Sequence, residues 1–111
     1  MDPEQARELL ARERHRVEQA LSRLRREPDE ELSHVDQHPG DEGTELFEQE
    51  RDEGLANRLR EELGAIERAE RRVDDGTYGV SVESGEPIPD ERLQAVPWAE
   101  RTAQEQGRFE R

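Results

Sequence analysis

The chain contains no cysteine. Disulfides, thiol redox chemistry and a thiolate zinc site are therefore excluded. Only 29% of the 111 residues are hydrophobic and 4% are aromatic, which is too little apolar surface for a compact globule of this length. No apolar run approaches the roughly 20 residues that a membrane-spanning helix needs. We therefore expect an elongated helical or partly disordered protein without a membrane segment.

Lysine is also absent, so every strongly basic residue is arginine. The first residues, Met-Asp-Pro-Glu, lack the basic and apolar segments of a signal peptide, and we expect a cytoplasmic protein. No nucleophile with an adjacent base and no phosphate-binding loop is visible, so we do not expect an enzyme or a bound cofactor.

The net charge of −13 is concentrated in one quarter of the chain. Residues 29–53 contain eleven acidic residues against the single Arg51, whereas the flanking segments are much closer to neutral. Such a chain is repelled by phosphate backbones, which argues against direct nucleic-acid binding. The acidic block is either a solvated loop or a tip that docks into a basic or metal-containing cavity of a partner.

The pattern of residues 3–26 predicts a helix with a narrow apolar stripe. Leu10, Val17 and Leu24 follow one another at intervals of seven, and Ala6, Ala20 and Leu21 lie alongside. Asp2 is the expected N-cap before Pro3, and Pro28 is expected to end the helix.

Residues 44–74 repeat this pattern. Leu59, Ile66 and Val73 are again seven apart, with Leu55, Ala56, Leu63 and Ala69 beside them, and Thr44 is the expected N-cap. Two such stripes predict an antiparallel coiled-coil hairpin over residues 1–75, with an acidic tip around residues 29–45. The stripes are equally compatible with a purely structural hairpin that docks on nothing.

A metal site is an alternative interpretation of the tip. His34 and His38 are four residues apart, with Asp36 and Asp41 nearby, and on a helix these residues could bind a transition metal. Pro39 disfavours a helical conformation of the residue before it, and no further ligands follow a known spacing. We therefore expect no metal at the tip.

Residues 76–111 contain the spacing of a four-cysteine zinc finger with other residues at the ligand positions. Ser81 and Ser84 stand where a Cys-x-x-Cys-Gly knuckle would place its thiolates, and Thr102 and Glu105 repeat the spacing after Pro97. Hydroxyl groups are poor zinc ligands, so we expect no metal here either. The lobe must then be stabilised by packing, with residues 98–109 forming a C-terminal helix that begins after Pro97.

The residues around these positions resemble the finger of the DksA/TraR family. The matching segments are Tyr78-Gly79, Gly85-Glu-Pro-Ile88, Arg92-Leu93 and Ala95-Val-Pro97. The segment from Asp36 to Phe47 is similar to the tip of the YteA-like branch of that family. Against the family's Asp-x-x-Asp-x-Ala tip motif, Asp41 matches the second Asp, while His38 and Gly43 replace the first Asp and the Ala. The expected fold is thus mainly α, a coiled-coil hairpin followed by a degenerate finger-like lobe.

The resemblance implies a function. Members of this family insert their hairpin into the secondary channel of bacterial RNA polymerase, so that the tip approaches the active site without contacting DNA. The tip residues implied here are Asp36, His38, Asp41, Glu42, Gly43 and Glu45. We expect a monomeric transcription regulator whose partner is the polymerase. The alternative is a non-catalytic structural or interaction hairpin with another partner, including a second copy of itself.

Overall fold

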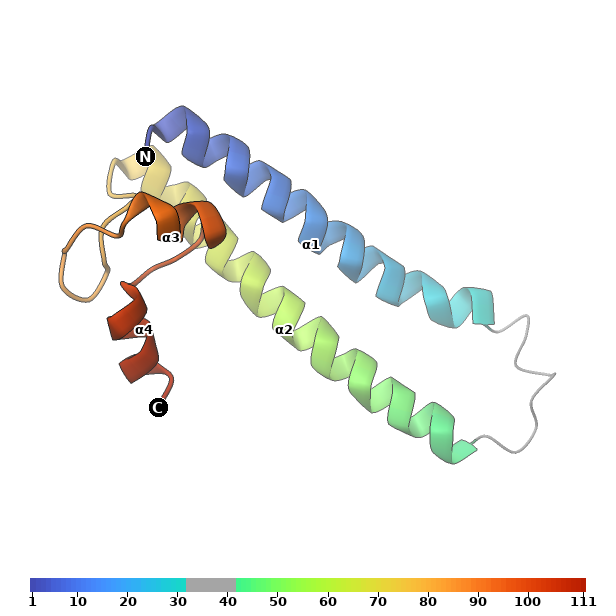
Figure 1. The fold of residues 1–111 in the computed structure, drawn as a ribbon. Coiled ribbons are helices and arrows are strands. Elements are labelled where there is room, and N and C mark those ends of the chain that lie inside the picture. The colour runs from blue at the N-terminus through green and yellow to red at the C-terminus, as the bar shows by residue number, and fades with distance from the viewer. Residues whose placement is uncertain (32–41) are drawn as a thin grey trace.

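The computed structural model describes the backbone of residues 1–31 and 42–111, and the side chains of residues 1–25 and 50–111. Over these residues the chain forms the helices α1 (Pro3–Glu31), α2 (Glu42–Asp75), α3 (Asp90–Ala95) and α4 (Ala103–Phe109). The long helices α1 and α2 lie side by side and run antiparallel, and the short helices gather at one end of the pair (Figure 1). The predicted fold, a helical hairpin followed by a small lobe, is confirmed.

Helix α1 begins as predicted and ends later than predicted. The Asp2 carboxylate accepts a hydrogen bond of 3.1 Å from the backbone N–H of Glu4, which identifies Asp2 as the N-cap before Pro3. The helix does not end at Pro28 but continues to Glu31. A proline removes one N–H donor, yet the φ angle that its ring imposes is itself helical, so the helix can run on for a further turn.

The two long helices share one buried seam, which we call the hairpin core: Ala6, Leu10, Val17, Leu59, Ile66, Ala69 and Val73. Leu10, Val17 and Ile66 have no exposed surface, and burial of each such side chain stabilises the fold by roughly 1.5–3 kcal/mol. The stripes predicted at intervals of seven are therefore the contact surface of the hairpin.

The seam weakens away from the lobe. Leu55, predicted to lie beside the stripe, is 39% exposed. The position seven residues before Leu59 is occupied by Asp52, so α2 offers no further apolar residue in register there. On α1, Leu24 is only partly buried against the core. The best-packed part of the hairpin is thus the part nearest the lobe.

Ion pairs along the seam favour the antiparallel register. Arg14 donates from Nε to a carboxylate oxygen of Glu70 at 3.3 Å, and Arg16 pairs with Glu62 nearby. All four side chains are partly exposed, and such surface pairs contribute about 0–1 kcal/mol each. They help to select the alignment of the two helices, while the apolar seam supplies most of the stability.

The lobe starts with a loop that turns back on itself. Val80 and Pro87 form an isolated antiparallel bridge, and the backbone N–H of Ile88 donates to the carbonyl of Gly79 at 2.8 Å. Gly85 has a φ of 76°, a conformation that side chains disfavour, and it closes the turn after Ser84. The lobe core that follows comprises three buried residues: Ile88, Leu93 and Ala99.

The helices of the lobe differ from the single helix predicted over residues 98–109. Helix α3 was not predicted, and α4 begins only at Ala103, because Thr102 rather than Pro97 caps it. Pro97 is fully buried, and its carbonyl accepts a hydrogen bond of 2.8 Å from the Tyr78 hydroxyl. The residues after Pro97 therefore form a packed turn instead of the first turn of a helix.

Helix α2 and the lobe are joined by polar and apolar contacts. Arg68 donates from Nη2 to the Glu100 carboxylate at 2.8 Å, and Arg72 lies 3.7 Å from the other oxygen of that carboxylate. Tyr78 and Trp98 pack against the hairpin core from the lobe side. Within the described ranges, every helix is too short or too polar to span a lipid bilayer.

Candidate functional site

The predicted tip lies only partly within the described residues. Asp36, His38 and Asp41 fall outside them, as does His34 of the metal site considered above. The backbone of Glu42, Gly43 and Glu45 is helical and forms the first turn of α2. The predicted tip site therefore remains a prediction.

Helix α2 begins two residues earlier than predicted. Thr44 lies inside the helix and does not cap it, because the helix starts at Glu42. The sequence places Glu42 and Glu45 in the first turn, where the partial positive charge of a helix N-terminus favours carboxylates. The end of α1 and the start of α2 lie at the end of the hairpin opposite the lobe (Figure 1). At 1.5 Å per residue, α2 separates its own two ends by roughly 50 Å.

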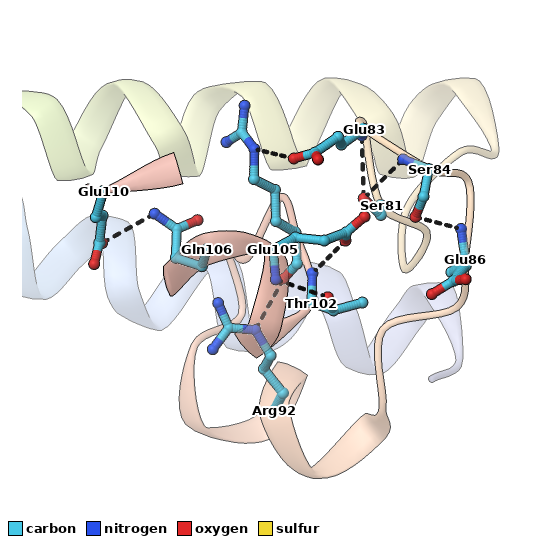
Figure 2. Close-up of polar contacts among 10 residues, drawn as sticks. Ser81, Glu83, Ser84, Glu86, Arg92, Thr102, Glu105, Gln106 and Glu110 are labelled. Carbon is cyan, nitrogen blue, oxygen red and sulfur yellow. Dashed lines mark hydrogen bonds and ion pairs between the residues drawn. The ribbon is translucent and has the colours of Figure 1, made fainter. Parts of the chain in front are cut away.

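The second predicted site, in the lobe, is fully described, and its four residues come together. Ser81 is 3% exposed and Glu105 is 4% exposed, although 24 positions separate them in the chain. Figure 2 shows the Glu105 carboxylate turned toward Ser81 and Thr102, with Ser84 on the adjoining turn. The positions that a four-cysteine finger would use for its ligands are thus neighbours here.

Hydrogen bonds fix the residues of this site. The Ser81 hydroxyl oxygen accepts from the backbone N–H groups of Glu83 at 3.1 Å and Ser84 at 3.2 Å, which shapes the turn. At the start of α4, the Thr102 N–H donates to Glu105 Oε1 at 3.0 Å, and the Glu105 N–H donates to Thr102 Oγ1 at 3.2 Å. This reciprocal pair is a capping box.

The electrostatics of the site centre on Glu105. Hydrogen bonding by the Ser84 hydroxyl, the Thr102 N–H and the Ser81 hydroxyl lowers the pKa of the Glu105 carboxyl to about 2. Hydrogen bonds to the charged form outweigh burial, which acts in the opposite direction. The carboxylate therefore stays ionised at any physiological pH.

These residues do not fit a structural zinc ion. Such ions are bound by four sulfur or nitrogen ligands, and the site offers two serines, a threonine and one carboxylate. Within the described part of the chain, no cluster of three or more His, Cys, Asp or Glu side chains could hold a metal. The carboxylate is already engaged by the donors around it.

A second charged cluster, which sequence reasoning missed, joins the lobe to α2. Burial opposes ionisation of Glu100, but the hydrogen bonds from Arg68 and the charge of Arg72 prevail and lower its pKa. Burial lowers the pKa of Arg72 in turn, although Glu100 opposes this shift. No local pattern marks the cluster, because its arginines and Glu100 are about 30 residues apart in sequence.

Comparison with known proteins identifies the lobe. Residues 76–111 match the family model of the prokaryotic DksA/TraR C4-type zinc finger. The lobe is similar to a DksA/TraR finger but has no cysteines. The resemblance inferred from the finger frame is thereby confirmed, and the assignment of the four clustered residues to the ligand positions of that finger stays a prediction.

Three curated relatives are similar in sequence to part of this chain. General stress protein 16O of Bacillus subtilis is 47% identical over 46% of this chain and 31% of its own length. The RNA polymerase-binding transcription factor DksA of Caulobacter vibrioides is 46% identical over 50% of this chain and 39% of its own. YteA of Bacillus subtilis is 48% identical over 36% of this chain and 17% of its own. The match thus spans less than two fifths of each relative.

One solved structure covers nearly the whole chain. Transcription factor DksA2 from Pseudomonas aeruginosa matches 97% of this chain and 82% of its own, with a TM-score of 0.77 and 25% identity. The hairpin and the DksA/TraR finger are therefore arranged here as they are in DksA2.

Proposed function

We propose that this protein is a transcription regulator that binds bacterial RNA polymerase. Its hairpin enters the secondary channel, and the acidic tip approaches the active site. The observation that carries the proposal is the match to DksA2 over both the hairpin and the lobe, in a chain whose relatives include a polymerase-binding transcription factor.

The geometry supports this role. Helix α2 separates the tip from the lobe by roughly 50 Å, so the tip can reach into a narrow channel while the lobe remains outside it. Tyr78 and Trp98, which pack against the hairpin core, and the Arg68–Glu100 contact hold the hairpin and the lobe together. A hairpin joined rigidly to a lobe fixes how far the tip penetrates.

The charge distribution supports a tip that acts by electrostatics. Residues 29–53 contain eleven acidic residues and one arginine. In a channel of low dielectric constant, carboxylates interact strongly with a catalytic cation or with basic side chains. The tip, with Asp41 and Glu42 as its principal charges and Asp36, His38, Gly43 and Glu45 around them, then shifts the balance between polymerase states without covalent chemistry.

The proposal includes further expectations about partners. The protein acts as a cytoplasmic monomer and does not contact DNA directly, because its net charge of −13 opposes binding to phosphates. Its effect on transcription therefore comes from the polymerase alone.

Two measurements test the proposed function. Tagged protein passed through a bacterial lysate should retain the large polymerase subunits as the main captured species. In transcription with purified polymerase, the wild type should change the yield from at least one promoter, and Asp41→Asn should abolish or weaken the change while still binding.

Asp75→Asn is the matched control, because it makes the same chemical change at the opposite, exposed end of α2. It should behave as wild type in both measurements. If the protein does not bind polymerase, the proposed function is wrong. If Asp41→Asn regulates as well as wild type, the tip mechanism is wrong and the hairpin acts as a binding module only.

A further inference from the structure

Of the four residues at the ligand positions, three can donate hydrogen bonds, and the fourth, Glu105, carries a carboxylate that accepts them. The Ser81 hydroxyl oxygen accepts two backbone N–H groups, and the Ser84 hydroxyl oxygen accepts the N–H of Glu86 at 3.2 Å. Each serine therefore keeps its hydroxyl proton to donate. The Thr102 N–H donates to the Glu105 carboxylate at 3.0 Å, and Figure 2 shows that carboxylate turned toward Ser81. Hydrogen bonding by the Ser84 and Ser81 hydroxyls contributes to the lowered pKa of Glu105.

This arrangement goes beyond a helix cap. A capping box involves only residues of one helix start, here Thr102 and Glu105. Here the Glu105 carboxylate also faces the turn of Ser81 and Ser84, about 20 residues earlier in the chain, and both Ser81 and Glu105 are buried. Arg101, next to Thr102, adds a second link, since its Nε lies 3.5 Å from the Glu83 carboxylate on that turn.

We propose that the Glu105 carboxylate replaces the zinc ion as the structural centre of this finger, and that Ser81, Ser84 and Thr102 hold it in place of cysteine thiolates. The polarity of the site is thereby reversed: an anion surrounded by hydrogen-bond donors occupies the place of a cation surrounded by anionic ligands. With a carboxylate or with a zinc ion at the centre, the turn of Ser81 and Ser84 is linked to the start of α4.

Because the site is buried, the loss of this cross-link should lower the stability of the lobe. Glu105 is 4% exposed, and a buried carboxylate that loses its donors carries a large desolvation penalty. The donors and the carboxylate therefore depend on one another, and the lobe has only three buried hydrophobic residues to stabilise it otherwise. The proposal is independent of the proposed function, because it concerns only how the lobe folds.

The first test asks whether a metal contributes. The full chain is purified without chelator and analysed for zinc, and its unfolding is followed with and without added zinc chloride or EDTA. We expect no stoichiometric zinc and the same unfolding midpoint in all conditions. One zinc per chain, or a midpoint lowered by EDTA, would overturn the proposal.

The second test removes the central charge. Glu105→Gln keeps the size of the side chain, and Glu86→Gln makes the same change at an exposed position of the same lobe. Trp98 is the only tryptophan of the chain, so its fluorescence reports on the lobe. We expect Glu105→Gln to lower the thermal midpoint of this signal by about 5 °C or more, and Glu86→Gln to leave it nearly unchanged.

Equal midpoints for the two variants would show that the carboxylate is not the structural centre. If Glu105→Gln prevents the lobe from folding, Ser84→Ala supplies a graded case, because it removes one donor at an exposed position. It should lower the midpoint by less than Glu105→Gln does. A Ser84→Ala midpoint equal to that of wild type would then contradict the proposal.

The third test introduces four cysteines to create a zinc site. The quadruple variant Ser81→Cys, Ser84→Cys, Thr102→Cys and Glu105→Cys should bind one zinc per chain, and its lobe should become sensitive to EDTA. This result is expected because the four positions are already neighbours in the fold (Figure 2). A folded quadruple variant that binds no zinc would show that the four positions do not enclose a metal-sized site.

Discussion

The hairpin buries seven apolar residues along one repeating seam, whereas the lobe buries only a cluster of three and Pro97 and relies on polar contacts for much of its cohesion. The seam tolerates change at its edges, because each position repeats the chemistry of its neighbours. The lobe has no such repeat: Glu105, Tyr78 and Glu100 each make a different, specific polar contact. A small lobe without cysteine ligands or disulfides therefore depends on a few specific polar groups.

The largest expected effect lies in the hairpin. Leu10→Ala should lower the free energy of unfolding by about 2–5 kcal/mol, because Leu10 is fully buried in the hairpin core. Leu9→Ala is the control at the adjacent, partly exposed position, which is outside that core. Urea unfolding followed by helix circular dichroism measures both. Equal losses would mean that the seam is not the main source of stability.

A fall in pH should lower the stability of the lobe and thereby distinguish it from the hairpin. The folded pKa of Glu105, about 2, lies below the value of about 4.3 of an unfolded glutamate, so its contribution is present above pH 4.3 and is lost as the pH falls toward 2. The lowered pKa of Glu100 acts in the same direction. Trp98 fluorescence should show the lobe losing stability in this window. Glu105→Gln should flatten the dependence, and a wild-type lobe equally stable at pH 7 and pH 3 would contradict this expectation.

The next effect concerns the lobe core. Tyr78→Phe should lower stability by about 1–2 kcal/mol, because it leaves the buried Pro97 carbonyl without its donor. Burial raises the pKa of Tyr78 to about 12, and this is the only tyrosine, so absorbance titration reports on it directly. Ionisation near pH 10 in the folded protein would show that the hydroxyl is not buried as described.

The smallest expected effect returns to the hairpin surface. Arg16→Ala should change stability by about 0–1 kcal/mol, because its pair with Glu62 is partly exposed and screened by salt. A double-mutant cycle with Glu62→Gln, measured at low and high salt, isolates the pair. A coupling energy as large as the Leu10→Ala loss would reverse the view that the apolar seam dominates.

Two local signals in the sequence located their structures, whereas the expected cap Thr44 and two prolines misled. Asp2 before Pro3 predicted the start of α1, and the intervals of seven predicted the seam. Pro28 did not end α1, since the φ angle that its ring imposes is compatible with a helix. Pro97 did not begin α4, although Thr102 and Glu105 have the spacing of a capping box that could have marked the true start.

The sequence by itself determined the hairpin, the concentration of acidic residues and the absence of a thiolate metal site, because each depends on residue types or on a short repeat. Only the tertiary structure decided which residues meet in the lobe. Ser81 and Glu105 are buried side by side because two turns of the lobe bring them together, and neither residue carries a local sign of the other. The junction of Glu100 with Arg68 and Arg72 was likewise decided by packing, since contacts between distant residues follow from the fold and not from local sequence.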